Sequence, residues 1–160
     1  MIQDSGDRTH FDSGAVRDIG TGKGRCDLMP LDIVGQLMHG RYPEVQCVWL
    51  DSIAKFIETH NTQFIRSVII SFSEMVFSSF TDAMLEVSIH YEEGAVKYGE
   101  HNWEKGIPAH SFLDSAVRHL FKFLRGDTDE RHDRAFLWNL LGLLWTIEHR
   151  PELDDIGGIR

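Results

Sequence analysis

The second half of this 160-residue chain carries carboxylate and imidazole side chains at spacings that a helix would place on shared faces. Carboxylate oxygens are the ligands that Mg²⁺ and Mn²⁺ prefer, and these ions bind triphosphates and activate water for attack on phosphorus. Zinc is less favoured, because there is no close pair of thiols and no His-Glu-x-x-His pattern. The acids that we expect to converge on a metal are Glu92, Glu93, Asp114, Glu130 and Asp133.

Histidines accompany these acids and keep a second chemistry open. His90, His119 and His132 lie in the same half of the chain, each within a segment of helical periodicity. Imidazole nitrogens suit transition metals, so the three residues are also compatible with a different phosphohydrolase built around such an ion. Both an oxygen-rich and a histidine-rich site fit the sequence.

A glycine-rich segment near the N-terminus brings two cations together. Lys23 and Arg25 lie next to Gly22 and Gly24, and glycines beside cations can present both backbone amides and positive charge to a phosphate. The Gly-x4-Gly-Lys-Ser/Thr spacing of a Walker loop is absent. The segment is therefore either a phosphate contact or a flexible basic turn.

Apolar periodicity predicts the elements that must position these groups. Residues 1–30 are rich in Gly, Asp, Ser and Arg, so we expect an irregular arm. Beyond Pro30, apolar side chains recur at the 3.6-residue period, Pro43 suits a first helical turn, and Ser111 with Asp114 suits a capping box. The predicted helices span residues 31–39, 43–59, 62–78, 82–98, 111–125 and 129–149, which gives one all-α domain, a helical bundle, over residues 1–160.

Two of these helices carry the chemically interesting groups on predicted faces. In 82–98 the period puts Glu92 on the apolar side, where a carboxylate needs a charge partner or a metal. The apolar side comprises Met84, Leu85, Ile89 and Val96, and the adjacent face comprises Glu86, His90, Glu93 and Lys97. Glu130 and Asp133 are three residues apart, so a helix starting at residue 129 would turn both carboxylates the same way.

The loop over residues 99–108 contains an aromatic ring beside polar groups. Its glycines and Pro108 rule out a regular helix throughout. Asn102, Trp103 and Lys105 form an arrangement that can stack and hold a nucleobase. A tryptophan that packs as a hydrophobic plug fits the same pattern.

Composition and charge exclude several classes of protein. The formal net charge is −9, whereas a protein that binds a nucleic-acid polymer needs a basic surface, so no such partner is expected. Cys26 and Cys47 have no metal-binding spacing and fit reduced thiols in a cytoplasmic protein. Apolar runs such as 137–147 are too short to cross a bilayer, so no membrane partner is expected, and the polar N-terminus does not resemble a signal peptide.

Several short segments of the sequence together resemble one family. They span residues 11–18, 22–28, 91–95, 97–99, 102–108, 114–120 and 138–141, among them Asn102-Trp103-Glu104-Lys105-Gly106-Ile107-Pro108 and Trp138-Asn139-Leu140-Leu141. The chain resembles the dATP/dGTP diphosphohydrolase-like family of phages and bacteria, over residues 11–34 and about 82–148. That family is similar to the MazG-like all-α nucleoside triphosphate pyrophosphohydrolases.

The resemblance implies a metal-dependent enzyme that cleaves a purine deoxynucleoside triphosphate to the monophosphate and pyrophosphate. Mg²⁺ or Mn²⁺ would be required, with His119 and His132 as ligands beside the acids, and Glu93 or Glu130 as general base. It also implies a dimer or tetramer in the cytoplasm of a bacterium or a phage-infected host. The implied substrate contacts are Lys23, Arg25, Lys97 and Arg118 for the phosphates, Asn102, Trp103 and Asn139 for the base or sugar, and Lys105.

The sequence departs from the superfamily pattern in two places. The second acidic motif, Glu-x-x-Asp, is matched by Glu130 and Asp133, but the first, Glu-x-x-Glu, is absent because His90 stands three residues before Glu93. Residues 35–80 form a predicted helical insertion beside the catalytic helices 82–149. A catalytically silent nucleotide-binding or interaction protein of the same fold is therefore the alternative.

Overall fold

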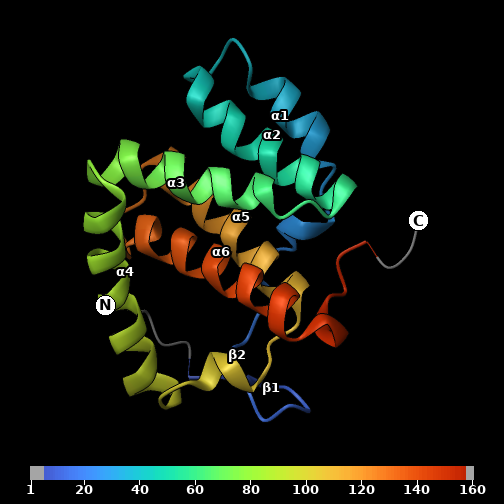
Figure 1. Cartoon of the computed structure of the whole chain (residues 1–160), viewed down its shortest axis with the longest axis vertical. Helices are drawn as coiled ribbons and strands as arrows, with labels where there is room; N and C mark the ends of the chain where they lie inside the picture. The colour runs from blue at the N-terminus through green and yellow to red at the C-terminus, as the bar shows by residue number, and fades with distance from the viewer. Residues whose placement is uncertain (1–5, 158–160) are drawn as a thin grey trace.

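A computed structural model describes residues 6–157, and within that range six α-helices and one two-stranded sheet form the molecule (Figure 1). The strands are β1 (Arg8–His10) and β2 (Val16–Asp18), and the helices are α1 (Leu31–Met38), α2 (Glu44–Thr59), α3 (Gln63–Phe77), α4 (Phe80–Tyr98), α5 (Ala109–Arg125) and α6 (His132–His149). Short 3-10 helices lie at Cys26–Leu28, Asn102–Lys105 and Pro151–Leu153. The predicted all-α class is confirmed, and every predicted helix is present.

The hairpin of α5 and α6 forms the centre of the bundle. Helix α3 crosses it, α1 and α2 form a second hairpin beyond α3, and α4 runs along one edge (Figure 1). Phe72 of α3 joins these layers, because its ring centroid lies 4.7 Å from that of Phe136 and 5.2 Å from that of Phe123. Helices α5 and α6 approach closely at Gly142, where any Cβ atom would overlap the ring of Phe112.

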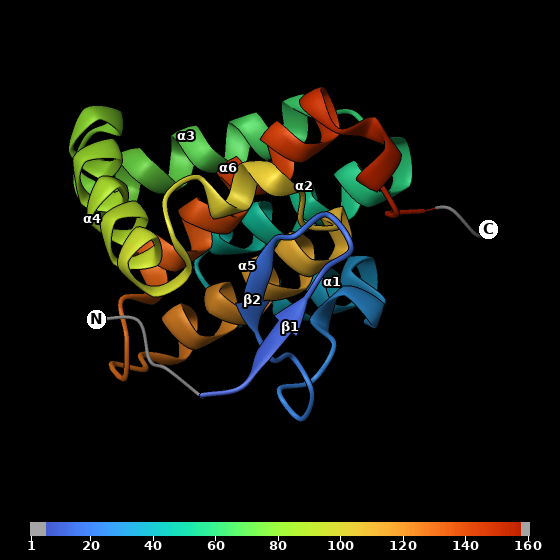
Figure 2. The same ribbon diagram turned by 90° about the horizontal axis from the view of Figure 1, so that it is seen from below.

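The N-terminal arm is more ordered than the sequence predicted. Strand β1 pairs antiparallel with β2, with Thr9 opposite Arg17, and Gly14 closes the turn at a φ of 83°. The side-chain amide of Asn102 holds the strand by accepting from the Val16 amide at 2.8 Å and donating to the Val16 carbonyl at 2.7 Å. The hairpin lies across α5 (Figure 2). Its strands have three residues each, too few to leave an alternating pattern in the sequence.

The face of α4 that turns inward is the opposite of the predicted one. Its exposed side comprises Leu85, Ile89, Glu92 and Val96, and its inward side comprises Ala83, Val87, His90 and Glu93. Val96 is 87% exposed and Leu85 is 69% exposed. Helix α4 packs on α3 and α6 from the edge of the bundle. The apolar stripe of Leu85, Ile89 and Val96 is therefore left uncovered by the residues that the structure describes, 6–157.

The predicted start of α5 is wrong by two residues. The helix begins at Ala109, because Pro108 has a ψ of 140°, outside the helical region, and directly precedes it. Ser111 and Asp114 therefore do not form a capping box. Asp114 lies in the second turn and faces the N-terminal arm, where its Oδ1 accepts from the Cys26 amide at 2.6 Å.

The predicted start of α6 is also wrong, and this changes the geometry of the acidic motif. Arg131, with φ −81° and ψ 79°, is not helical, and its guanidinium contacts Asp133 at 2.7 Å. The helix therefore begins at His132, which leaves Glu130 in the preceding loop. The two carboxylates of Glu130 and Asp133 do not share a helix face.

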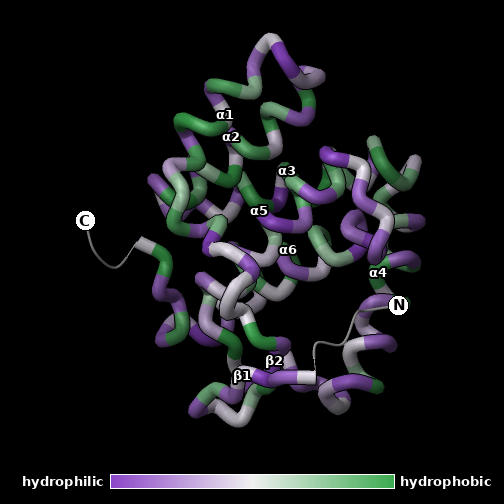
Figure 3. Tube along the Cα trace, turned by 180° about the vertical axis from the view of Figure 1, so that it is seen from behind, coloured by the Kyte–Doolittle hydropathy of each residue, from purple (hydrophilic) through white to green (hydrophobic). Residues whose placement is uncertain are grey.

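Hydrophobic and hydrophilic residues alternate along the helices (Figure 3). Within residues 6–157, no single α-helix has both the length and the apolar composition needed to cross a bilayer. Helices α3 and α4 meet those two criteria only as a pair, which is bent by 94° at their junction.

Candidate functional site

Three side chains from the α5–α6 hairpin converge on one point. The Nδ1 atoms of His119 on α5 and His132 on α6 lie 3.0 Å apart. Oε1 of Glu130, in the loop between the helices, lies 3.6 Å from each of these nitrogens. We call these three residues the His–Glu cluster. Two imidazole nitrogens and a carboxylate oxygen this close together form a donor set for a divalent metal ion.

A carboxylate outside the cluster fixes the orientation of His132. Oδ1 of Asp129 lies 2.7 Å from Nε2 of His132, and Oδ2 of Asp129 accepts from Lys122 Nζ at 3.0 Å. These two hydrogen bonds hold the pKa of Asp129 well below its usual range, so the carboxylate is ionised and requires a proton on Nε2 of His132. Nδ1 of His132, the second ring nitrogen, faces Glu130 and His119. Metal-binding histidines are commonly oriented in this way by a carboxylate.

His119 is held neutral by its surroundings. Burial lowers the pKa of its imidazole well below the usual value, and the neighbouring His132, His90 and Arg118 lower it further. A neutral imidazole has one free lone pair, so His119 is in the protonation state that binds metals. Without a metal, the 3.0 Å contact requires one of the two Nδ1 atoms to carry a hydrogen and the other to accept it.

His90 lies beside the cluster on the inward face of α4. Its ring centroid is 5.7 Å from that of Trp138. Burial lowers the pKa of His90 to about 4, although the nearby carboxylate of Glu93 raises it. His90, which stands in place of the first acid of Glu-x-x-Glu, is therefore a neutral imidazole at pH 7. The acid on this side of α4 is Glu93.

The burial of His90 makes the metal-free protein sensitive to acid. An unfolded histidine has a pKa near 6.5, so between pH 6.5 and 4 the unfolded chain binds more protons and the stability falls as the pH falls. We expect a loss of about 2–3 kcal/mol from this residue between pH 7 and pH 4.5. Urea unfolding at both pH values measures it. The loss should be smaller in His90→Asn, and an equal loss in both proteins would contradict this account.

The other predicted metal ligands are not members of the His–Glu cluster. Glu92 is exposed on the outer face of α4. Asp114 is 7% exposed and is engaged by Arg118 and by the Cys26 amide. Asp133 accepts from Arg131 and from the backbone amide of Arg134. The structure thus brings Glu130, His119 and His132 together, and Glu93 lies near His90. Asp133 lines the same pocket as Glu130 and His132 but is engaged by Arg131.

Arg17 is a candidate functional residue that sequence reasoning missed. Its guanidinium lies over the rings of Phe112 and Trp138, at 5.1 and 5.6 Å, and donates to Oδ1 of Asn139. Burial lowers the pKa of Arg17 to about 10, so the group remains a cation at pH 7. Within residues 6–157 its Nη1 has no hydrogen-bond partner. A buried cation with an unused donor is suited to a phosphate oxygen.

The predicted phosphate cations fall into two groups. Lys23 is exposed and lies near Glu130, and partial desolvation of its ammonium group, together with the proximity of Arg118 and Lys97, lowers its pKa. Arg118 donates to the Gly24 carbonyl at 3.0 Å, and its buried Nε has no partner among the described residues. Lys97 pairs with Asp18 at 2.7 Å. Arg25 instead pairs with Asp27, and its Nε donates to Oδ1 of Asp27 at 2.7 Å.

The predicted base and sugar contacts have structural roles in this conformation. Both polar groups of Asn102 bind the backbone of Val16. Trp103 packs edge-on against Trp145, with ring centroids 4.9 Å apart, which fits the hydrophobic-plug interpretation. Lys105 is exposed on the 3-10 helix. Asn139 anchors Arg17 and donates to the Ala135 carbonyl.

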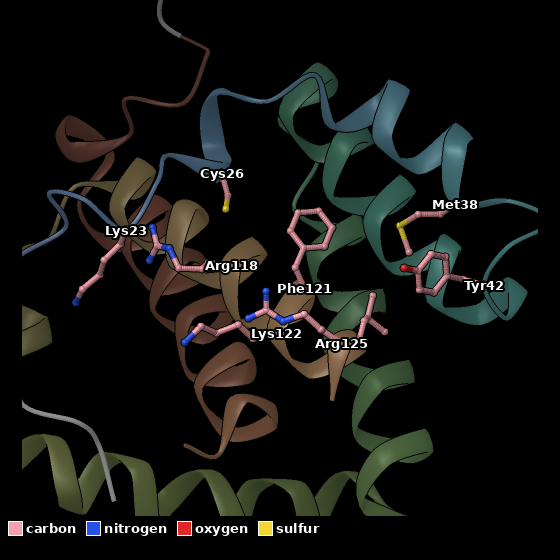
Figure 4. Close-up of a pocket in the computed structure, with 9 residues that line it drawn as sticks. Lys23, Cys26, Met38, Tyr42, Arg118, Phe121, Lys122 and Arg125 are labelled. Atoms are coloured by element: carbon pink, nitrogen blue, oxygen red, sulfur yellow. The ribbon is translucent and has the colours of Figure 1, made fainter. Parts of the chain in front are cut away.

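A cavity of about 490 Å³ opens between α5 and the end of α1 (Figure 4). We call it the α1–α5 cleft. Its volume is within the range of roughly 300–1,000 Å³ that is typical of small-molecule sites. It is lined by Lys23, Cys26, Met38, Tyr42, Arg118, Phe121, Lys122, Leu124 and Arg125.

Comparison with known proteins gives one match. The model of the family described as dATP/dGTP diphosphohydrolase, N-terminal, matches residues 70–156, from within α3 to just beyond α6. The match includes the whole His–Glu cluster and excludes the N-terminal arm, α1 and α2. No curated protein and no solved structure matched the chain. The relation to MazG-like enzymes stays a prediction.

Proposed function

Because the chain belongs to the dATP/dGTP diphosphohydrolase N-terminal family, we propose that it hydrolyses purine deoxynucleoside triphosphates to the monophosphate and pyrophosphate. The observation that carries this proposal is the His–Glu cluster next to cations with unused donors. Nη1 of Arg17 and Nε of Arg118 are buried without partners among residues 6–157. A metal-binding group beside cations with unused N–H donors is what a triphosphate substrate requires.

The donor atoms fit one of the two expected metal ions better than the other. Mg²⁺ prefers oxygen ligands in octahedral geometry, whereas Mn²⁺ also accepts imidazole nitrogen. His119, Glu130 and His132 offer two nitrogens and one oxygen, so these residues suit Mn²⁺. When bound, such an ion polarises a phosphoryl oxygen and makes water a stronger nucleophile.

The residues of the chain supply the remaining parts of the reaction. Arg17, Lys23 and Arg118 would neutralise and orient the phosphates. The oxygen of a water molecule forms a bond to the α phosphorus, the bond from that phosphorus to the α–β bridging oxygen breaks, and pyrophosphate leaves with that oxygen. A carboxylate takes the proton from the water. Glu130 within the cluster is the first candidate for this general base, and Glu93 beside His90 is the second.

The proposal extends to assembly and location. A homo-oligomer, either a dimer or a tetramer, would cover the exposed stripe of Leu85, Ile89 and Val96 on α4. The free thiols of Cys26 and Cys47 suit the cytoplasm of a bacterium or a phage-infected host. The net charge of −9 supports a nucleotide substrate over a nucleic-acid polymer.

A second candidate function has specific support from the histidines. The contact between His119 and His132 also suits a transition-metal phosphohydrolase that cleaves another phosphate bond. A silent nucleotide-binding protein of the same fold is the third, and the absence of the first Glu-x-x-Glu motif favours it. These candidates differ in products and in turnover.

The rate of hydrolysis across a panel of substrates tests the proposal. The eight common NTPs and dNTPs are incubated with the protein in Mn²⁺, in Mg²⁺ and in EDTA, and pyrophosphate release is followed. We expect turnover of dATP and dGTP, faster with Mn²⁺ than with Mg²⁺ and lost in EDTA. Bound nucleotide without turnover under every condition would instead support the silent protein.

A further inference from the structure

The two ends of the α1–α5 cleft differ in chemistry. Lys23 and Arg118 lie at one end, Met38 and Tyr42 lie at the other, and the ring of Phe121 lies between them (Figure 4). The lining therefore changes from charged to apolar along the cavity, as a ligand with an anionic end and an aromatic end would require.

The charged side of the cleft leads to the His–Glu cluster. Lys122 lines the cleft and donates to Asp129 at 3.0 Å, and Asp129 binds His132 at 2.7 Å. Lys23 lies close enough to Glu130 for the carboxylate to influence its pKa. The cations of the cleft are therefore linked to the His–Glu cluster through Asp129 and through the proximity of Lys23 to Glu130.

The charge of the cleft is unusual for this protein. The whole chain carries a net charge of −9, yet the cavity is lined by Lys23, Arg118, Lys122 and Arg125 and by no carboxylate. Three of these cations pair with aspartates outside the lining, and no hydrogen bond or ion pair joins the Lys23 ammonium to another group within residues 6–157. An anionic ligand complements such a cavity.

We propose that the α1–α5 cleft binds the nucleotide, with the purine stacked against Tyr42 and Phe121 and the phosphates directed past Lys23 and Arg118 to the His–Glu cluster. The identity of the nucleotide rests on the proposed function. Base recognition then depends on Tyr42, which lies before residue 70 and thus outside the part of the chain that the family model matches. The helical segment that precedes α4 has a direct role at the substrate site.

Replacing Tyr42 tests the base end of the cleft. The side chain is 46% exposed, so Tyr42→Ala should fold normally. Loss of one stacking ring should raise KM for dATP roughly tenfold with little change in kcat, because the interaction is equally strong in the ground and transition states. Leu37→Ala is the matched control, since Leu37 is 60% exposed on α1 and does not line the cleft. Equal KM values for the two variants would overturn the proposal.

The thiol of Cys26 gives a second readout that does not depend on turnover. Its sulfur points into the cleft, whereas Cys47 is fully buried and serves as an internal reference (Figure 4). The α,β-methylene analogue of dATP, which cannot be cleaved at that position, should slow maleimide labelling of Cys26 at least roughly tenfold at saturation. Protection should weaken in Tyr42→Ala and persist in Leu37→Ala.

The two experiments separate failure of the inference from failure of the function. Protection of Cys26 without any hydrolysis would keep the cleft as a nucleotide site and overturn the proposed reaction. If dATP is hydrolysed while Cys26 stays unprotected and KM is unchanged in Tyr42→Ala, the cleft is not the nucleotide site, although the proposed reaction stands.

Discussion

Glu130→Gln should reduce the rate of dATP hydrolysis roughly 10²- to 10⁴-fold, as expected for the loss of a general base. The side chain is 17% exposed and its carboxylate lies 3.6 Å from both imidazoles of the cluster. Glutamine has the same shape but cannot accept the proton and is a weaker metal ligand. The affinity for Mn²⁺, measured by electron paramagnetic resonance, should therefore fall as well, roughly ten- to a hundredfold.

Glu74→Gln is the matched control for this substitution. Glu74 is exposed on α3, outside the hairpin that carries the cluster, and its substitution should leave both rate and Mn²⁺ affinity within twofold, about 0.4 kcal/mol. Full activity in Glu130→Gln would contradict the assignment of Glu130. If Glu93→Gln were inactive at the same time, the general base would be the acid on α4.

Phe72→Ala should lower the free energy of unfolding by about 3–5 kcal/mol, the usual cost of removing a buried phenyl ring. The ring is fully buried and lies between α2, α5 and α6, with centroids 4.8 Å from Trp49 and 4.7 Å from Phe136. No neighbouring side chain can fill the space without leaving its own contacts. Urea unfolding followed by tryptophan fluorescence measures the loss.

Met75→Ala on the same helix controls for helix propensity. Met75 is 58% exposed, so its truncation should change the free energy of unfolding by no more than about 0.5 kcal/mol. A loss in Phe72→Ala as small as that would mean that α2 and α3 do not share a core with the α5–α6 hairpin.

Helix content could be predicted from the sequence because most helices bury one apolar stripe. In α2, Trp49, Ile53 and Phe56 recur at the helical period, and all three are buried in the structure. The same reasoning failed for α4, where Leu85 and Val96 face solvent. Periodicity identifies the apolar side of a helix, but it contains no information on whether this chain or another molecule covers that side.

The site was only partly predictable, because its geometry depends on a helix boundary and on tertiary packing. His119 and His132 were candidate ligands, yet their 3.0 Å contact arises from the register of the α5–α6 hairpin, which has no local signal. Glu130 turns towards them because α6 starts late, at His132. Arg17 was one basic residue in a polar arm until the fold placed it between Phe112 and Trp138.

The identity of the products tests the central claim most directly. Purified protein is incubated with dATP and Mn²⁺ in parallel with Glu130→Gln, and the products are separated by anion exchange. We predict dAMP and pyrophosphate in equal amounts from the wild-type protein and neither from the variant. Inorganic phosphate with dADP, or deoxyadenosine with triphosphate, would contradict cleavage between the α and β phosphates.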